Sequence, residues 1–266
     1  DGFELNFSCS HGMAESGGGA AIGGNEEMIR KVTGWVREET LKPVMTKLPA
    51  IVQDIPGKAK AAQEAGADAI ASINTLNSLP GIDIHSFVPY PSVDGRSAFQ
   101  GLSGAAIKPV ALRTVAQIAD SVQIPVSGIG GISNWKDAVE FIAVGASLQV
   151  CSAVMHHGYR IINDLNAGLL NYMEEMGFES INDFCKKALP HIFRHNDLNR
   201  AYKLYSSPDP ETCIGCGRCV AVCQDSAYSA IHLDENRIAV VDREKCDGCG
   251  LCYGICPAQA ITMARK

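Results

Sequence analysis

The sequence of 266 residues predicts an α/β protein in two parts, a portion of a (β/α)8 barrel followed by a small α+β domain. Three observations predict it. Runs with strand character alternate with runs of helical periodicity over residues 1–155. Polar or glycine-rich residues follow each strand-like run, which is typical of the active face of a barrel. Eight of the eleven cysteines lie in the last fifth of the chain, in two runs with one spacing.

The alternation can be followed in order along the chain. Strands are expected at Glu4–Ser8, Val44–Leu48, Ala69–Asn74, Pro125–Ile129 and Ser147–Cys151. Helices are expected between them, at Glu26–Thr40, Ile55–Ala65, Pro109–Ser121 and Asn134–Val144. Repeated βα units predict a parallel sheet covered by helices, with a doubly wound sheet as the competing architecture. Five βα units are three short of a barrel, so we expect the N-terminal units to be missing from this sequence.

Three segments follow from this pattern. Residues 1–155 form the barrel portion with the active site, residues 156–206 a helical extension and linker, and residues 207–266 the small domain. Within the extension, apolar residues recur at helical spacing over Gly158–Met176, and a second helix is expected at Ser180–Ala188.

The small domain follows a turn-rich stretch, Ser206–Pro210, which predicts a linker. Each cysteine run is followed by a predicted helix and a short strand, at Ala230–Leu233 and at Ala260–Met263. The two halves therefore read as an internal duplication. A domain of this size has little apolar core, so we expect bound metal to stabilise it.

The cysteine runs have the spacing that holds iron–sulfur cubanes. In such runs three thiolates bind one cluster, and the fourth cysteine reaches the other cluster. One predicted ligand set for a [4Fe–4S] cluster is Cys213, Cys216, Cys219 and Cys256, and the other is Cys246, Cys249, Cys252 and Cys223. Zinc sites use paired C-x-x-C modules about 15–20 residues apart, and disulfide frameworks belong to secreted proteins, so both fit less well.

Bulk properties exclude other classes of function. The net charge of −6 leaves no basic surface for nucleic acid. No apolar run is long enough to cross a membrane. Oxygen-sensitive clusters without a visible secretory signal predict a cytoplasmic protein.

Glycine-rich turns after the last two barrel strands predict a phosphate site. Gly128-Ile129-Gly130-Gly131-Ile132 precedes a helix, where backbone amides without a neighbouring Cβ bind phosphate. Cys151-Ser152-Ala153 follows the next strand and completes the site, which in barrels lies after strands seven and eight. Gly101-Leu102-Ser103-Gly104 is a third loop suited to close approach. A plain tight turn is the alternative reading of each.

Three other strand ends carry candidate chemistry. Lys47 ends an apolar strand and favours an anionic cofactor in the barrel mouth, although a solvated lysine is the common alternative. Asn74 and Thr75 offer the paired donors and acceptors that read the imide of a heterocycle. Cys9 begins a polar, glycine-rich loop, which suits a proton donor or base, whereas a buried structural thiol is the alternative.

Clusters carry one electron each, whereas most organic reductions need a pair. A flavin converts between the two, so a phosphate-binding barrel joined to clusters predicts FMN. The sequence shows no dinucleotide fingerprint after an early strand, so NAD(P)H is expected to bind elsewhere.

Several motifs resemble the dihydropyrimidine dehydrogenase family, over essentially the whole chain. They are Glu4–Cys9, Ile73–Thr75, Gly101–Pro109, Ser127–Ile132 and Leu148–Ala153. Within this family the sequence is similar to the pyrimidine-reducing subunit of bacterial members. Class 1 dihydroorotate dehydrogenases share the barrel motifs, but a C-terminal ferredoxin domain is not typical of them.

The resemblance implies reduction of uracil or thymine to the 5,6-dihydropyrimidine, with Cys9 as the acid and FMN as hydride donor. It implies substrate contacts from Asn6, Phe7, Ser8, Asn74 and Thr75. It implies FMN contacts from Lys47, Gly101, Ile129, Gly130, Gly131, Cys151 and Ser152. It also implies a partner reductase subunit that carries FAD and binds NAD(P)H, hence a hetero-oligomer. Ser10 stands where the family often has proline.

Two other functions remain open. One is a dihydroorotate dehydrogenase with a fused ferredoxin domain, although no extra cation for the orotate carboxylate accompanies the substrate loops. The other is a non-catalytic electron-transfer module, against which the retained Cys9 and Lys47 argue.

Overall fold

The computed structural model describes residues 1–9, 16–50, 53–199 and 201–265. The chain divides into two compact units, Asp1–Ile192 and Phe193–Lys266, and each is described by itself. Within the described ranges, no helix has the length and apolar character needed to cross a bilayer.

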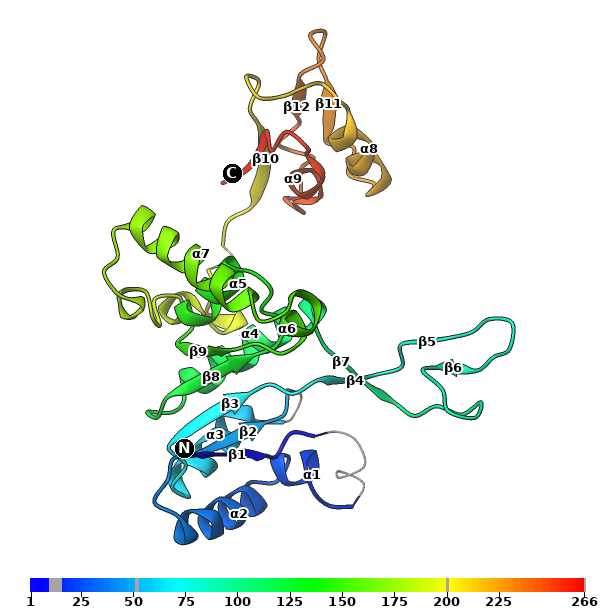
Figure 1. Ribbon diagram of the computed structural model, residues 1–266. Coiled ribbons are helices and arrows are strands. Elements are labelled where there is room, and N and C mark those ends of the chain that lie inside the picture. The colour runs from blue at the N-terminus through cyan, green and yellow to red at the C-terminus, as the bar shows by residue number, and fades with distance from the viewer. Residues whose placement is uncertain (10–15, 51–52, 200, 266) are drawn as a thin grey trace. The chain divides into compact units, whose positions relative to one another are not determined.

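A parallel sheet of five strands organises the first unit (Figure 1). Its strands are β1 (Phe3–Asn6), β2 (Val44–Leu48), β3 (Ala69–Ser72), β8 (Val126–Ile129) and β9 (Ala146–Gln149). They lie side by side in the order β1-β2-β3-β8-β9, which is the order of the chain. A doubly wound sheet reverses its strand order once, so that alternative is excluded. The order is that of consecutive barrel units, and the sheet is open rather than closed.

Helices follow the strands and bury one face of the sheet. They are α1 (Ala20–Gly23), α2 (Glu26–Glu39), α3 (Ile55–Glu64), α4 (Lys108–Ala119), α5 (Trp135–Ala143), α6 (Ser152–His157) and α7 (Ile161–Met176). Side chains alternate across a strand. In β2, Val44, Thr46 and Leu48 are therefore buried, while Met45 and Lys47 lie on the opposite face and are half-buried. Residues on that opposite face are the ones available for a site.

A long arm between β3 and α4 was not predicted. It consists of two antiparallel ribbons, which pair β4 (Leu76–Ser78) with β7 (Gln100–Leu102) and β5 (Gly81–Ile82) with β6 (Pro89–Tyr90). Figure 1 shows the arm extending away from the sheet. Strands of two or three residues carry too little periodicity to be recognised in a sequence.

The end of the first unit corrects one expectation. The predicted helix at Ser180–Ala188 is wrong, because this segment forms turns with a 3₁₀ turn at Ile181–Asp183, followed by another at Leu189–His191. The ring of Phe184 is buried and stacks on Phe178 with centroids 5.4 Å apart. This aromatic packing against α7 holds the segment in an irregular path, whereas the predicted helix before it is confirmed as α7.

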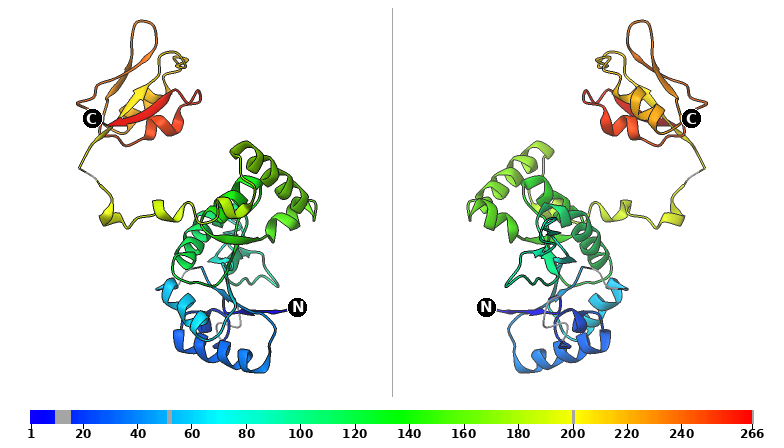
Figure 2. Two further views of the ribbon diagram at one scale, coloured as in Figure 1. Left: turned by 90° about the vertical axis from the view of Figure 1, so that its left-hand side faces the viewer. Right: turned by 90° about the vertical axis from the view of Figure 1, so that its right-hand side faces the viewer.

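The second unit holds four strands and two α-helices within its described residues. They are β10 (Leu204–Pro208), α8 (Arg218–Asp225), β11 (Ile231–Leu233), β12 (Ala239–Val241), α9 (Leu251–Ile255) and β13 (Ile261–Arg265), after a 3₁₀ turn at His195–Asp197. Strands β10 and β13, yellow and red in Figure 2, pair antiparallel and join the start of the unit to its end. The predicted strands at Ala230–Leu233 and Ala260–Met263 are confirmed as β11 and β13.

The predicted linker Ser206–Pro210 is wrong in its first half. Ser206, Ser207 and Pro208 lie in β10, because they pair with β13 and the side chain of Ser206 is buried. A strand whose partner lies about 55 residues away gives no local sign of its pairing.

Candidate functional site

A cavity of about 380 Å³ lies at the carboxyl ends of β2, β3, β8 and β9. It gathers eight of the residues expected to bind cofactor or substrate. These are Lys47, Asn74, Thr75, Ile129, Gly130, Gly131, Cys151 and Ser152. Carboxyl ends of parallel strands meet at one edge of a sheet, so residues from four separate βα units converge here.

The sheet curls around the inner end of this cavity. Glu4 on β1 accepts a hydrogen bond of 3.0 Å from the Gln149 amide on β9 and forms an ion pair of 3.3 Å with Lys47. β1 and β9 are the two edges of the sheet, and four flat strand spacings would set them about 19 Å apart. The bridge therefore requires strong curvature. Glu4 and Gln149 were not among the predicted site residues, although Glu4 lies on the same face of β1 as the predicted Asn6.

The turn after β8 requires glycine at two positions. Gly130 and Gly131 have φ angles of +134° and +80°. A Cβ on Gly130 would lie 2.7 Å from the Ala111 Cβ, and one on Gly131 would lie 2.8 Å from the Lys108 backbone nitrogen. Both glycines therefore let the turn pack directly on the start of α4 while lining the cavity.

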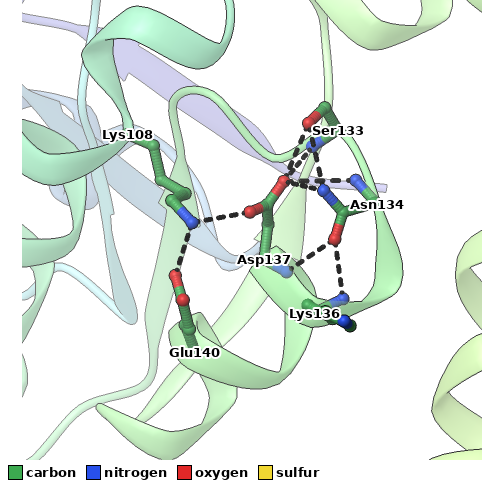
Figure 3. Close-up of polar contacts among 6 residues, drawn as sticks. All are labelled: Lys108, Ser133, Asn134, Lys136, Asp137 and Glu140. Carbon is green, nitrogen blue, oxygen red and sulfur yellow. Dashed lines mark hydrogen bonds and ion pairs between the residues drawn. The ribbon is translucent and has the colours of Figure 1, made fainter. Parts of the chain in front are cut away.

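Behind this turn, the first turn of α5 is capped by its own side chains (Figure 3). Asn134 accepts from the backbone N–H groups of Lys136 and Asp137. Asp137 accepts from the backbone N–H groups of Ser133 and Asn134 and from the Ser133 hydroxyl, at 2.8–3.2 Å. The amides expected to hold phosphate at this helix end are therefore already bonded. The glycines of the turn itself, and the start of α6, are what line the cavity.

A partly buried ion pair fixes this capping segment to α4. Lys108 Nζ lies 2.7 Å from Asp137 Oδ1 and 2.8 Å from Glu140 Oε2. Burial alone would raise the pKa of Asp137, but the bonds from Lys108 and Ser133 outweigh it and hold the pKa below its ordinary value. The hydrogen bonds to Asp137 and Glu140 raise the pKa of Lys108. Both groups are therefore charged at neutral pH.

A hydrogen-bonded chain joins β1 to the cavity wall. The Asn74 amide donates to Ser8 Oγ at 3.1 Å, and the Ser8 hydroxyl donates to Asn6 Oδ1 at 2.8 Å. The Thr75 N–H donates to Asn74 Oδ1 at 2.8 Å. Asn6, Ser8, Asn74 and Thr75 thus form one network, of which Asn74 and Thr75 line the cavity.

The remaining predicted residues lie outside the cavity lining. The side chain of Phe7 packs in the hydrophobic core. Cys9 follows the buried Ser8 and is half-buried, and its carbonyl accepts from the Ala20 N–H at 2.8 Å. Gly101 lies in β7, where a Cβ would contact the Thr75 hydroxyl. Ser10 and His11 lie outside the described residues.

Twelve of the twenty described lining residues were not among the predicted contacts, and these twelve include two residues of the loop after β7 and two histidines of α6. Ser103 and Gly104 belong to a loop whose glycines signalled a close approach, and Ser103 Oγ lies 2.9 Å from Ser152 Oγ. His156 and His157 line the cavity from α6. Since α6 has only six residues, periodicity gave no sign of it.

In the second unit, two small cavities are each lined by four cysteines. One is lined by Cys213, Cys216, Cys219 and Cys256, and the other by Cys223, Cys246, Cys249 and Cys252. Each set takes three sulfurs from one run and the fourth from the other. Within the described ranges, no three metal-binding side chains converge closely enough for a single ion. Four sulfurs around a shared space fit a cluster of several irons instead.

The surroundings of these sulfurs suit iron-bound thiolates. The Ala230 N–H donates to Cys223 Sγ at 3.2 Å, and the Ala260 N–H donates to Cys256 Sγ at 3.3 Å. Burial raises the pKa of Cys219 and of Cys252, so a thiolate there requires a positive partner such as iron.

Comparisons with known proteins match both parts of the chain. The family model described as dihydroorotate dehydrogenase matches residues 1–173, and one described as a 4Fe-4S dicluster domain matches residues 208–263. The NAD-dependent dihydropyrimidine dehydrogenase subunit PreA of Escherichia coli (strain K12) is 37% identical over 239 residues, which cover 88% of this chain and 58% of that protein.

Two further relatives match less of the chain. The chloroplastic dihydropyrimidine dehydrogenase (NADP(+)) of Arabidopsis thaliana is 37% identical over 76% of this chain and 49% of its own length. The catalytic subunit of dihydroorotate dehydrogenase B (NAD(+)) of Thermococcus kodakarensis is 43% identical over 71% of this chain and 60% of its own length. The chain therefore spans between about half and three fifths of each relative's length.

The resemblance to the dihydropyrimidine dehydrogenase subunit and the predicted combination of barrel and iron–sulfur domains are both confirmed. The first family implies a flavin, FMN, and the second domain implies iron–sulfur centres. This chain belongs to the dihydroorotate dehydrogenase family, a family of flavin-dependent α/β-barrel oxidoreductases, and carries a 4Fe-4S dicluster domain over residues 208–263.

Proposed function

We propose that this chain is the pyrimidine-reducing part of a dihydropyrimidine dehydrogenase. It reduces uracil or thymine to the 5,6-dihydropyrimidine with electrons from a partner subunit that carries FAD and binds NAD(P)H. One observation carries the proposal: a cavity at the strand ends, lined by the expected residues, occurs in the same chain as two four-cysteine cavities. Similarity to PreA extends over both parts.

The residues of the larger cavity suit FMN. Gly130 and Gly131 let the chain approach a phosphate closely, and Cys151 and Ser152 add the start of α6. Lys47 supplies a cation that favours negative charge on the N1–O2 edge of the ring. Ile129 and Gly101 complete the proposed contacts. FMN, when bound, supplies hydride to C6 of the pyrimidine.

The network of Asn6, Ser8, Asn74 and Thr75 suits a neutral heterocycle with an imide. Amide and hydroxyl groups both donate and accept, so they match the alternating N–H and C=O groups of uracil. Their mutual hydrogen bonds hold them in place before substrate arrives. Phe7, between Asn6 and Ser8 in the chain, contributes by packing in the core. The thiol of Cys9, one residue beyond Ser8, donates the proton that C5 receives.

Each four-cysteine cavity holds one [4Fe–4S] cluster. Cys213, Cys216, Cys219 and Cys256 bind the first cluster, and Cys223, Cys246, Cys249 and Cys252 bind the second. Such clusters suit a reducing, cytoplasmic location. The proposed path leads from the partner subunit through clusters to the barrel, so the working enzyme is a hetero-oligomer.

A dihydroorotate dehydrogenase is the second candidate, because the Thermococcus subunit is 43% identical over the barrel part. Orotate carries a carboxylate, which a cationic side chain binds most strongly. Lys47 is a cation in the described lining of the cavity, but it is paired with Glu4 and is the proposed partner of the flavin ring, so it is not free to bind a substrate carboxylate. The neutral network therefore favours uracil or thymine. Parallel assays with dihydrouracil and dihydroorotate, at matched flavin content, separate the two candidates.

Replacement of Cys9 by alanine tests the catalytic assignment. We expect uracil reduction to fall about 10²–10⁴-fold, the usual contribution of a general acid, while flavin content stays unchanged. Cys185→Ala is a matched control, since Cys185 is also half-buried and lies outside the cavity lining. Full turnover in Cys9→Ala would remove the acid from this position. A flavin-free but iron-loaded protein would favour the electron-transfer module instead.

A further inference from the structure

The two cysteine cavities differ at one equivalent pair of positions. Ser206 lies seven residues before Cys213, and Ala239 lies seven residues before Cys246. Each lies on a strand, β10 or β12, and each lines the cavity built mainly by the other run. The second cavity therefore has a serine hydroxyl where the first has only an alanine methyl group.

The hydroxyl of Ser206 points at cysteine sulfur. Its Oγ lies 2.8 Å from Cys252 Sγ and 3.9 Å from Cys246 Sγ. The residue is 2% exposed, so water does not satisfy this group. A thiolate bound to iron carries no proton, so in the loaded protein the serine hydroxyl is the donor and the sulfur the acceptor.

The other donors to sulfur are backbone N–H groups, and both cavities have them. Those of Cys219 and Val220 bond the Cys219 sulfur in the first cavity, and that of Tyr253 bonds the Cys252 sulfur in the second. Cys223 and Cys256 each accept one backbone N–H, at 3.2 and 3.3 Å. Arg218 lines the first cavity and Tyr228 the second, and both side chains are exposed, so solvent and salt screen their effect. Among the described residues that line the two cavities, Ser206 is thus the buried polar side chain that one cavity has and the other lacks.

We propose that the Ser206 hydroxyl raises the reduction potential of the second cluster above that of the first, so that a single electron entering this unit resides on the second. Reduction adds one negative charge to a cluster, and hydrogen bonds to its sulfurs favour the more negative state. This inference depends on the proposed binding of two clusters, and the electron comes from the partner subunit or, in the test, from dithionite.

The test uses the full chain, purified without air, with iron and sulfide measured first. Midpoint potentials are then obtained by redox titration with dithionite, followed by electron paramagnetic resonance. We expect Ser206→Ala to lower the ratio of reduced to oxidised cluster about fivefold at a given potential. At about 59 mV per tenfold change, this is a fall of about 40 mV in one midpoint potential. Ala239→Ser should raise the other midpoint by a similar amount, which identifies the first cluster.

Ser207→Ala is the matched control, because Ser207 is the next residue of β10 and lies on the opposite face of the strand. It should leave both midpoints unchanged. Midpoint potentials that stay unchanged in Ser206→Ala would overturn the inference. So would a wild-type protein that first reduces the cluster whose midpoint potential Ala239→Ser raises. Either result would leave the proposed function intact. A protein that binds no iron would overturn both. If Ser206→Ala fails to assemble, Ala239→Ser alone decides, since it must raise a midpoint.

Discussion

Replacing Asp137 with asparagine tests whether the capping segment behind the glycine turn is held by charge. One oxygen of Asp137 accepts four hydrogen bonds from Ser133 and Asn134, and the other accepts from Lys108 at 2.7 Å. Asparagine keeps the shape but offers a single acceptor oxygen. Its amide nitrogen then faces either these donors or the Lys108 ammonium, so part of the network must be lost.

The magnitude follows from burial. Removing one partner of a buried ion pair costs about 3–5 kcal/mol, and hydrogen bonds to a charged group contribute about 1.5–3 kcal/mol each. The side chain of Asp137 is 7% exposed, but Lys108 is 27% exposed and keeps Glu140 as a partner. We therefore expect a loss of about 2–3 kcal/mol. For a unit of this size that lowers Tm by about 4–12 °C.

Tryptophan fluorescence reports this change selectively. The chain has two tryptophans, Trp35 on α2 and Trp135 on α5, and both belong to the first unit. When the full chain is heated, the change in tryptophan fluorescence therefore reports the unfolding of the first unit alone. Glu140→Gln is the matched control, because its side chain is 44% exposed and its loss should cost less than about 1 kcal/mol. A Tm for Asp137→Asn equal to that of the control would refute the reasoning.

The same pair of proteins gives a pH dependence. Because the folded protein lowers the pKa of Asp137 below 3.8, its stabilising effect is complete above the unfolded value and is lost as pH falls through the folded value. The Tm difference between wild type and Asp137→Asn should be full above about pH 5 and shrink below pH 3.8. A difference that does not change with pH in this range would assign the effect to shape instead of charge.

Three further predictions concern the cofactors. Gly131→Ala should destabilise the first unit by about 1–2 kcal/mol, because φ is +80° and the new Cβ would collide with Lys108. It should also lower the flavin content that remains after desalting. An unchanged Tm and an unchanged flavin absorbance would contradict this prediction. Lys47→Met should lower the flavin midpoint potential, because it removes the cation beside the ring; an unshifted titration would exclude that contact. Cys223→Ser combined with Cys246→Ser should leave half of the iron, because both residues line one cavity and belong to one proposed ligand set; loss of all iron would exclude the crossed ligation.

The barrel strands and helices could be predicted because their signals are local and long enough. β2 alternates buried and half-buried residues, and α2 has an asparagine cap and an amphipathic face. The crossed cysteine sets could be predicted from their spacing, and each predicted set lines one of the two cavities. These features require no knowledge of distant contacts.

What the sequence did not reveal depends on tertiary structure. The bridge from Glu4 to Gln149 exists only because the sheet curls, and β10 forms only because β13 reaches it. The capping box of Asn134 and Asp137 is visible as a local motif, yet the glycines before it suggested a phosphate site at the helix end. The arm between β3 and α4 has strands too short for any periodicity.

The proposed function has one chain pass electrons between a pyrimidine bound by the first unit and clusters bound by the second unit. The most direct measurement is to add dihydrouracil to the air-free, fully loaded chain while recording flavin absorbance and the paramagnetic signal of reduced clusters. Bleaching of the flavin followed by the cluster signal is the expected result. A flavin that stays oxidised would exclude oxidation of dihydrouracil by this chain, and a flavin that bleaches without a cluster signal would exclude electron transfer to the clusters.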